Sequence, residues 1–302
     1  MKILLFGRGG QVGWELQRSL SVLGEVVALD FDATRNPQNL CGSFSDLAGL
    51  AATVQAVRPD IIVNAAAHTA VDKAESEPDF ARSLNALAPG VLAAEAKKIN
   101  AWLVHYSTDY VFNGSGSAPW NETDVTGPLS VYGQTKLEGE LAVATNPKHI
   151  TLRTSWVYAA RGGNFAKTML RLATEREALT VIDDQFGAPT SAELLADVTA
   201  HVIRAAMAKP EFAGLYHCVA AGETNWHGYA KFVLQTAQAL GQTLKAGPDQ
   251  VAATSTASYP TPAQRPLNSR LNTSKLQQAF GLTLPHWQTG VARMLTEITG
   301  KQ

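Results

Sequence analysis

The chain has 302 residues, of which 45% are hydrophobic and 17% are charged, and its formal net charge is -1. This length can bury one large core or two modest ones, and the charge gives no electrostatic basis for a nucleic acid or an anionic membrane as partner. Cys41 and Cys218 lie far apart and outside any metal-ligand spacing, which is typical of thiols in a reducing compartment. Because the opening apolar run breaks at Gly7, we expect no signal peptide or membrane span, and a cytoplasmic location.

The first half of the chain alternates short apolar runs with helical patterns. Strands are predicted at residues 2–6, 25–30, 61–64, 102–106 and 150–153. Helices are predicted after the first strand and at about residues 46–57, 79–99 and 132–144. Such alternation predicts an α/β fold, a Rossmann-type doubly wound parallel sheet with ligands at the carboxyl ends of its strands.

The alternation loosens beyond about residue 160. Further helices are predicted near residues 164–177, 192–208, 226–240 and 286–299, and a Pro-, Ser- and Thr-rich stretch covers 254–265. We therefore expect a dinucleotide-binding domain at 1–160, with later strands interleaved, and a smaller substrate-binding lobe formed mainly by 161–302.

A glycine turn joins the first strand to the first helix. Gly7 permits the tight turn, Gly10 lets the backbone approach a pyrophosphate, and Gly13 allows the helix to pack closely on the strand. The amides at the start of the helix then face the anion. The spacing differs by one residue from the commonest dinucleotide fingerprint, but the strand, turn and helix context favours a nicotinamide cofactor.

The second strand ends in Asp30, where a ribose of the dinucleotide needs a hydrogen-bond acceptor. This carboxylate favours NADH. Arg8 within the glycine turn and Arg35 beyond the strand could instead hold a 2′-phosphate, which favours NADPH. The sequence leaves both cofactors open.

Tyr132 and Lys136 are four residues apart, so on a helix they share one face. A phenol titrates near 10 in water, and a neighbouring ammonium would favour its phenolate form. Thr108 follows the strand that ends at Tyr106 and should lie at the mouth of the same crevice. These groups suit carbonyl reduction: Thr108 binds the substrate oxygen, Tyr132 delivers a proton, and a nicotinamide supplies hydride to the carbonyl carbon.

Together these motifs resemble the extended short-chain dehydrogenases/reductases and, among them, the dTDP-4-dehydrorhamnose reductase family. The resemblance covers essentially the whole chain and depends on strings at residues 6–13, 63–72, 107–112, 131–136 and 153–158. It implies reduction of the 4-keto group of dTDP-4-dehydro-L-rhamnose by NADPH or NADH, which yields dTDP-L-rhamnose for cell-surface polysaccharide.

The same resemblance implies individual roles. Tyr132 would be the proton donor, Lys136 its electrostatic partner and nicotinamide-ribose ligand, and Thr108 the contact to the substrate oxygen. The implied cofactor contacts are Gly7, Gly10, Gln11, Val12, Gly13, Asp30, Ser43, Phe44, Ala67, His68, Thr69 and Tyr106. Relatives commonly carry an acidic residue at the position of Ser43, which puts the adenine contact in doubt. Asp109 and Trp156 would touch the sugar.

In the C-terminal lobe, Arg265 and Asn268 are the best candidates for gripping the nucleotide diphosphate, because a guanidinium matches phosphate oxygens bidentately. Residues 183–190 form a second candidate rim. Trp226 lies in an aromatic pattern at helical spacing that is more typical of core.

Three other activities share this framework. Nucleotide-sugar 4,6-dehydratases carry Thr-Asp-Glu where this chain has Thr108, Asp109 and Tyr110, and a phenol cannot readily replace that carboxylate. Epimerases use the same hydroxyl, phenol and lysine and are not excluded. A regulatory subunit like that of methionine adenosyltransferase would bind the cofactor without turnover, but retention of all three reactive residues favours catalysis.

The resemblance also suggests a structural Mg²⁺ ion between monomers, since some members hold one through glutamates and Glu15, Glu193 and Glu297 occupy the corresponding places. Carboxylate oxygens are suitable ligands for this cation. The only protein partner suggested is a second copy of the chain, in a homodimer.

Overall fold

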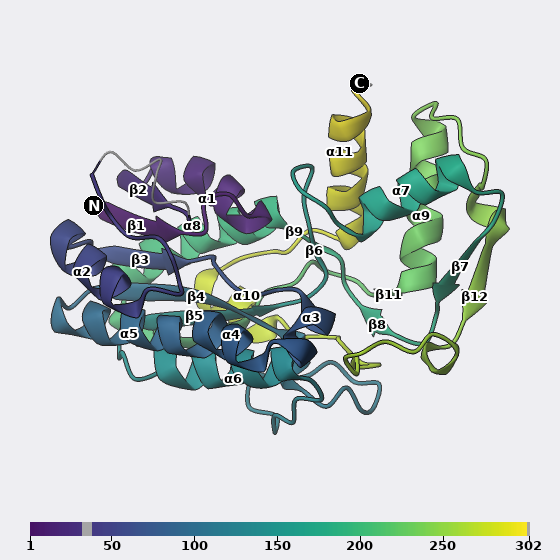
Figure 1. The fold of residues 1–302 in the computed structure, drawn as a ribbon. Helices are drawn as coiled ribbons and strands as arrows, with labels where there is room; N and C mark the ends of the chain where they lie inside the picture. The colour runs from purple at the N-terminus through teal and green to yellow at the C-terminus, as the bar shows by residue number, and fades with distance from the viewer. Residues whose placement is uncertain (32–37, 301–302) are drawn as a thin grey trace.

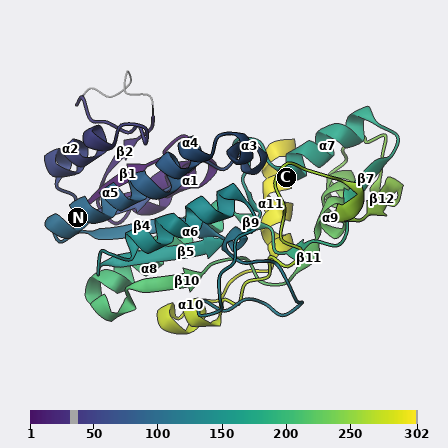
Figure 2. The same cartoon turned by 60° about the horizontal axis from the view of Figure 1, so that its bottom comes forward.

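The computed structural model describes residues 1–31 and 38–300. Its centre is a six-stranded sheet in the order β10-β5-β4-β3-β1-β2, in which all neighbouring pairs are parallel (Figures 1 and 2). The strands are β1 Lys2–Phe6, β2 Glu25–Leu29, β3 Ile61–Asn64, β4 Trp102–Thr108, β5 His149–Thr154 and β10 Gly214–His217. The strand order reverses between β1 and β3, which is where ligands bind in open α/β sheets. The predicted fold class is confirmed.

Helices cover both faces of the sheet because successive strand residues point to opposite sides. Ile3 and Leu5 pack in one buried cluster with residues of α1 Gln11–Ser21 and α8 Ala192–Ala208. Leu4 and Phe6 pack in another with residues of α2 Leu47–Val57 and α5 Ala88–Lys98. Next to α5 lies α6 Val131–Val143, on the same side of the sheet. The near-continuous apolar strands thus reflect burial on both faces.

Most predicted helices lie within a few residues of their expected bounds, and side chains at their starts explain why. Asp46 caps α2, Ser130 caps α6 and Ser191 caps α8 by accepting hydrogen bonds from backbone amides of the first turn. The continuous helix predicted at 79–99 is instead α4 Pro78–Arg82, a π-helical turn Ser83–Leu87 and α5. Apolar periodicity did not reveal two short helices, α3 Val71–Ser76 and α10 Ser274–Phe280.

A smaller lobe stands at one end of the sheet, where both views place its three helices (Figures 1 and 2). They are α7 Phe165–Glu175, α9 Trp226–Ala239 and α11 Trp287–Thr299, packed around a separate buried cluster that includes Tyr229 and Trp287. Three strand pairs join it: β6 Val157–Tyr158 with β9 Thr190–Ser191, β7 Leu179–Ile182 with β12 Val251–Thr254, and β8 Phe186–Gly187 with β11 Thr224–Asn225. Helices α8 and α10 and strand β10 come from the second half of the chain but pack with the large sheet.

Candidate active site

A cavity of about 810 Å³ lies between the sheet and the lobe. The predicted site residues that line it are Gly7, Gly10, Gln11, Val12, Asp30, Ser43, Phe44, Ala67, Thr69, Tyr106, Thr108, Asp109, Tyr132, Lys136 and Trp156. Gly13, His68, Arg265 and Asn268 are not among its lining residues. The carboxyl ends of β1, β3, β4 and β5 all reach this cavity. One hollow is therefore available to both a dinucleotide and a substrate.

The glycine turn has the backbone geometry expected of a phosphate-binding loop. Gly7 has a φ of 82°, in the left-handed region, and a Cβ on Gly13 would lie 1.9 Å from the Gly7 carbonyl oxygen. Gly13 therefore lets the helix pack closely on the turn, and its contact with a cofactor stays a prediction. Gly10 precedes the first turn of α1, so the amides of that turn open toward the cavity.

Asp30 is bonded to the backbone around the glycine turn. Its Oδ2 accepts a hydrogen bond from the Gly9 amide and its Oδ1 accepts one from the Phe31 amide, both at 2.9 Å. These bonds fix the carboxylate beside the turn, and each oxygen retains a lone pair for a ribose hydroxyl. A neighbouring hollow shares Asp30 and adds Arg8, Trp14 and Arg161, whose guanidinium lies 4.1 Å from the centre of the Trp14 ring. Arg35 lies outside the described residues.

Tyr132 is in the first turn of α6, as predicted, because Ser130 accepts the Gly133 amide at 3.2 Å and starts the helix at Val131. Burial raises the pKa of Tyr132 to about 12, and the nearby Asp109 carboxyl adds to this rise, while a hydrogen bond with Thr108 opposes it. Burial thus sets the direction of the shift, and the role of Lys136 toward the phenol stays a prediction. At neutral pH the phenol holds its proton, as a proton donor must.

Lys136 is 2% exposed, and its Nζ donates a hydrogen bond to the Tyr106 carbonyl oxygen at 2.6 Å. Burial lowers the pKa of this lysine to about 8, partly offset by the charge of Glu140. Glu140 in turn receives two hydrogen bonds, at 2.8 and 2.7 Å, from the buried guanidinium of Arg153. Burial therefore makes this lysine a weaker base than an exposed one.

Thr108 ends β4 next to a second carboxyl group. The Thr108 hydroxyl donates to Asp109 Oδ1 at 3.0 Å and accepts the Tyr110 amide at 3.2 Å. Burial raises the pKa of Asp109 to about 6, although hydrogen bonds from Ser269 and Thr108 oppose the shift. The Tyr110 ring packs edge-to-face on the Tyr132 ring, with centroids 5.5 Å apart. Hydroxyl, phenol and carboxyl therefore form one connected group beside the cavity.

The lobe contributes an aromatic wall. Trp156 has a φ of 50°, rare for a bulky side chain, and its ring stacks on Trp226 with centroids 3.8 Å apart. Both rings line the cavity. The Trp226 indole also donates to Gln185 Oε1 at 3.0 Å. The sequence pattern assigned Trp226 to the core, and its place on the wall depends on contacts from distant segments.

The two predicted diphosphate ligands have protein partners. Arg265 forms a two-pronged ion pair with Asp72 of α3, with N–O distances of 3.0 and 2.7 Å. The Asn268 amide nitrogen donates to the carbonyl oxygens of Ser115 and Ala118. Asn268 is 1% exposed and organises the loop around it. Their roles toward a substrate stay predictions.

Asn85, in the π-helical turn, was not predicted from the sequence as a residue that supports the site. It is fully buried; its Oδ1 accepts the His68 amide at 2.8 Å, and its Nδ2 donates to the His68 carbonyl and to Thr135 Oγ1, each at 3.1 Å. It therefore fixes the segment around His68, which contains predicted cofactor contacts, against α6. The His68 ring packs edge-to-face on Phe80. In the sequence, the one feature that could have indicated this role is a polar residue between apolar neighbours in a predicted helix.

Comparison with known proteins places this geometry in a family. A family model described as the RmlD substrate binding domain matches residues 1–299. The chain belongs to this family. Proteins named dTDP-4-dehydrorhamnose reductase from Shigella flexneri and Escherichia coli strain K12 are each 60% identical to it over 299 residues, which is 99% of this chain and 98% of theirs.

Solved structures agree with that assignment. A dTDP-4-dehydrorhamnose reductase from Clostridium acetobutylicum is 34% identical, with a TM-score of 0.88, covering 99% of this chain and 100% of that one. One from Bacillus anthracis, in complex with NADP, is 31% identical, with a TM-score of 0.85, covering 98% and 99%. Family members of known structure thus share the whole fold.

The three glutamates suggested as Mg²⁺ ligands lie near one another. Burial and the charges of Glu193 and Glu297 raise the pKa of Glu15, while Arg18 lowers it. Arg293 pairs with Glu193 at 3.2 Å. Within residues 1–31 and 38–300, no group of three or more His, Cys, Asp or Glu side chains is arranged to hold a metal ion. The expected Mg²⁺ gains no support from one chain, and the homodimer stays a prediction.

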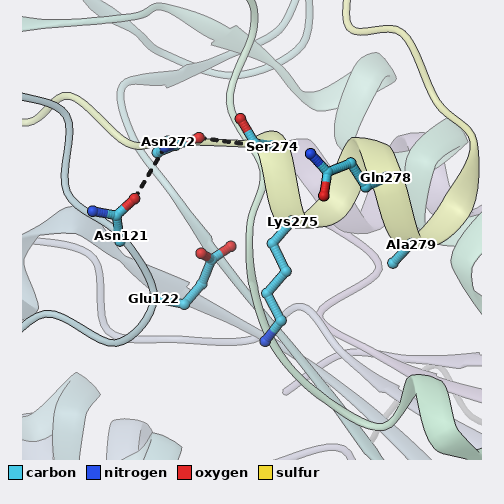
Figure 3. Close-up of a pocket in the computed structure, with 7 residues that line it drawn as sticks. All are labelled: Asn121, Glu122, Asn272, Ser274, Lys275, Gln278 and Ala279. Carbon is cyan, nitrogen blue, oxygen red and sulfur yellow. Dashed lines mark hydrogen bonds between the residues drawn. The ribbon is translucent and has the colours of Figure 1, made fainter.

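A second hollow lies away from the reactive group and has other chemistry (Figure 3). Several of its polar side chains already have protein partners: Lys275 donates to the Leu215 carbonyl at 2.7 Å, Glu122 accepts the His217 amide at 2.9 Å, and Asn272 donates to Asn121 at 3.0 Å. In the part of the chain that the structure describes, no helix combines the length and apolar character that crossing a membrane requires.

Proposed function

We propose that the chain reduces the 4-keto group of dTDP-4-dehydro-L-rhamnose with NADPH or NADH and forms dTDP-L-rhamnose, the activity that its relatives' name describes. The observation that carries the proposal is the grouping of Thr108, Tyr132 and Lys136 in one cavity with the glycine turn. Residues 1–160, together with α8, β10 and α10, would hold the cofactor, and the remaining C-terminal residues the sugar nucleotide.

The chain's own residues account for the proton chemistry. A reduced nicotinamide supplies the hydride that the ketone carbon accepts. As negative charge grows on the ketone oxygen, the Thr108 hydroxyl turns its one hydrogen bond from Asp109 to that oxygen, and the Tyr132 O–H bond breaks to give the oxygen its proton. The high pKa of Tyr132 keeps the donor protonated beforehand, and an alkoxide is basic enough to take the proton. Buried Lys136 would then stabilise the phenolate.

We further propose that NADPH is accepted as well as NADH. Arg8 and Arg161 line the hollow that shares Asp30 with the main cavity, so a 2′-phosphate there would meet two guanidinium groups. Asp30 keeps acceptor capacity for an unmodified ribose. Arg161→Ala should raise the KM for NADPH and leave that for NADH unchanged; equal effects on both would contradict this assignment.

The reaction itself is tested by the absorbance of the reduced nicotinamide. Addition of enzymatically generated dTDP-4-keto sugar to the protein with NADPH should cause a steady loss of absorbance and formation of dTDP-L-rhamnose. Bound cofactor without any loss would favour the non-catalytic binding role. Interconversion of two dTDP-hexoses that differ only in the configuration at C4, with no net change in the cofactor, would favour an epimerase.

A further inference from the structure

A line of three polar groups, the Ala66 amide, Asn64 and His105, leads to Lys136 through the middle of the sheet. Asn64 on β3 and His105 on β4 are paired neighbours. Asn64 Oδ1 accepts the Ala66 amide at 3.0 Å, Asn64 Nδ2 lies 3.0 Å from His105 Nδ1, and His105 Nε2 lies 3.4 Å from Lys136 Nζ. Asn64 and His105 are each 1% exposed. The mechanism above does not use this line.

The Ala66 amide sets the direction of the whole line because it can only donate. The Asn64 carbonyl oxygen must therefore face Ala66, and the Asn64 NH₂ group must face His105. His105 Nδ1 can then only accept. Burial, followed by the charge of Lys136, lowers the pKa of His105 well below its usual range, so the ring is neutral with one proton. That proton lies on Nε2 and points at Lys136.

An Nε2–H directed at Lys136 Nζ distinguishes the two forms of the lysine. A neutral amine has a lone pair that accepts this hydrogen bond, whereas an ammonium has only donors and is repelled. The carboxylate of Glu140 on α6 favours the ammonium form of Lys136, but Arg153 of β5 pairs with this carboxylate and neutralises its charge. The Tyr106 carbonyl of β4 accepts one hydrogen bond from Lys136. Among the described residues, the other titratable groups that line this end of the cavity are Tyr106, Asp109, Tyr110 and Tyr132.

We propose that His105 is a positioning residue for the reaction: its Nε2–H tautomer, set by Asn64, orients the Lys136 amine and weakens the lysine's hold on its proton. The catalytic part of this inference depends on the proposed reduction. After Tyr132 has given its proton to the product oxygen, a Lys136 that parts readily with a proton restores the phenol: an N–H bond breaks and an O–H bond forms.

The tautomer is tested on the parent protein without any turnover. In protein labelled with ¹⁵N-histidine, the ring nitrogens of His105, identified by the signals missing from His105→Gln, should show a protonated Nε2 and an unprotonated Nδ1. An Nδ1–H tautomer, or a doubly protonated ring at neutral pH, would overturn the proposal. This result holds or fails whether or not the ketosugar is reduced.

The effect on Lys136 is tested by the pH profile of kcat. In His105→Gln the side-chain amide can turn its oxygen toward the ammonium, so the alkaline limb should move to higher pH by about one unit. Asn64→Asp should shift it the same way, because a carboxylate takes the ring proton at Nδ1 and leaves Nε2 to accept. His149→Gln, at the opposite end of β5, should leave the limb in place.

A purely structural role predicts a different result. If both variants lose the same fraction of kcat at every pH and the alkaline limb does not move, His105 only supports the fold, and the proposal is overturned. A parent protein that binds NADPH but does not reduce the ketosugar would instead refute the proposed function and leave the tautomer measurement valid.

Discussion

The carboxyl edge of the sheet and the rim of the lobe build the two sides of one cavity in different ways. At the sheet edge, Thr108, Tyr132 and Lys136 come from β4 and α6, which pack directly on each other, and Thr108 and Lys136 are almost completely buried. At the rim, Trp156 and Arg265 belong to irregular segments and are held by partners far away in the sequence. The candidate reactive groups are preorganised, whereas the candidate substrate contacts depend on tertiary packing.

The largest effect should come from the sheet edge. Tyr132→Phe removes the proton donor without changing the ring, so kcat should fall by about 10³-fold, within the range of general acid catalysis. NADPH binding, measured by fluorescence titration, should stay within a few-fold of the parent. Tyr229→Phe is the matched control, since this lobe hydroxyl is buried and has no hydrogen-bond partner among the described residues. A Tyr132→Phe rate within a few-fold of the parent would refute the donor role.

The second effect concerns Asp109, whose pKa is raised to about 6 from the usual 3.8 by burial. Between those values the folded chain holds a proton that the unfolded chain has lost, so this group's contribution to stability falls as pH rises through that window. Asp109→Asn carries no charge. Its unfolding free energy relative to the parent should therefore increase by about 2 kcal/mol between pH 4 and pH 7. Urea unfolding at both pH values measures this, and a pH-independent difference would contradict the shift.

The same division explains what the sequence could predict. The parallel sheet, the glycine turn and the Tyr132 helix follow from local patterns, because apolar runs, glycines and caps act within a few residues. The helical spacing of Trp226 predicted a core position. Its stacking on the Trp156 ring depends on a segment 70 residues earlier in the chain, and local spacing carries no information on that contact. Burial likewise raises the pKa of Tyr132, in the direction opposite to the effect expected from Lys136. Local sequence patterns could not predict this, because burial is a property of the folded chain.

The third prediction concerns Arg265 and its proposed contact with the substrate at the rim of the lobe. If its guanidinium binds the diphosphate, Arg265→Ala should raise the KM for the dTDP sugar about tenfold with little change in kcat, as expected for loss of a charged contact. Asp72→Asn should leave KM unchanged or lower it, because it weakens the competing ion pair. Equal increases in both variants would mean that the ion pair itself shapes the rim. Arg171→Ala, which breaks an exposed pair within α7, is the control.

The smallest effect should come from the aromatic wall. Trp156 holds a φ of 50°, which costs about 1 kcal/mol or more unless neighbours stabilise it, and the stacked Trp226 ring supplies about that much. In Trp226→Leu the Trp156 backbone should relax, so the KM for the sugar nucleotide should rise about fivefold while kcat changes less. Phe280→Leu, which breaks a ring pair with Phe212 outside the cavity, should change neither constant. If Trp226→Leu keeps the parent KM and a crystal structure shows Trp156 unmoved, other contacts hold the wall, and the rim is as preorganised as the sheet edge.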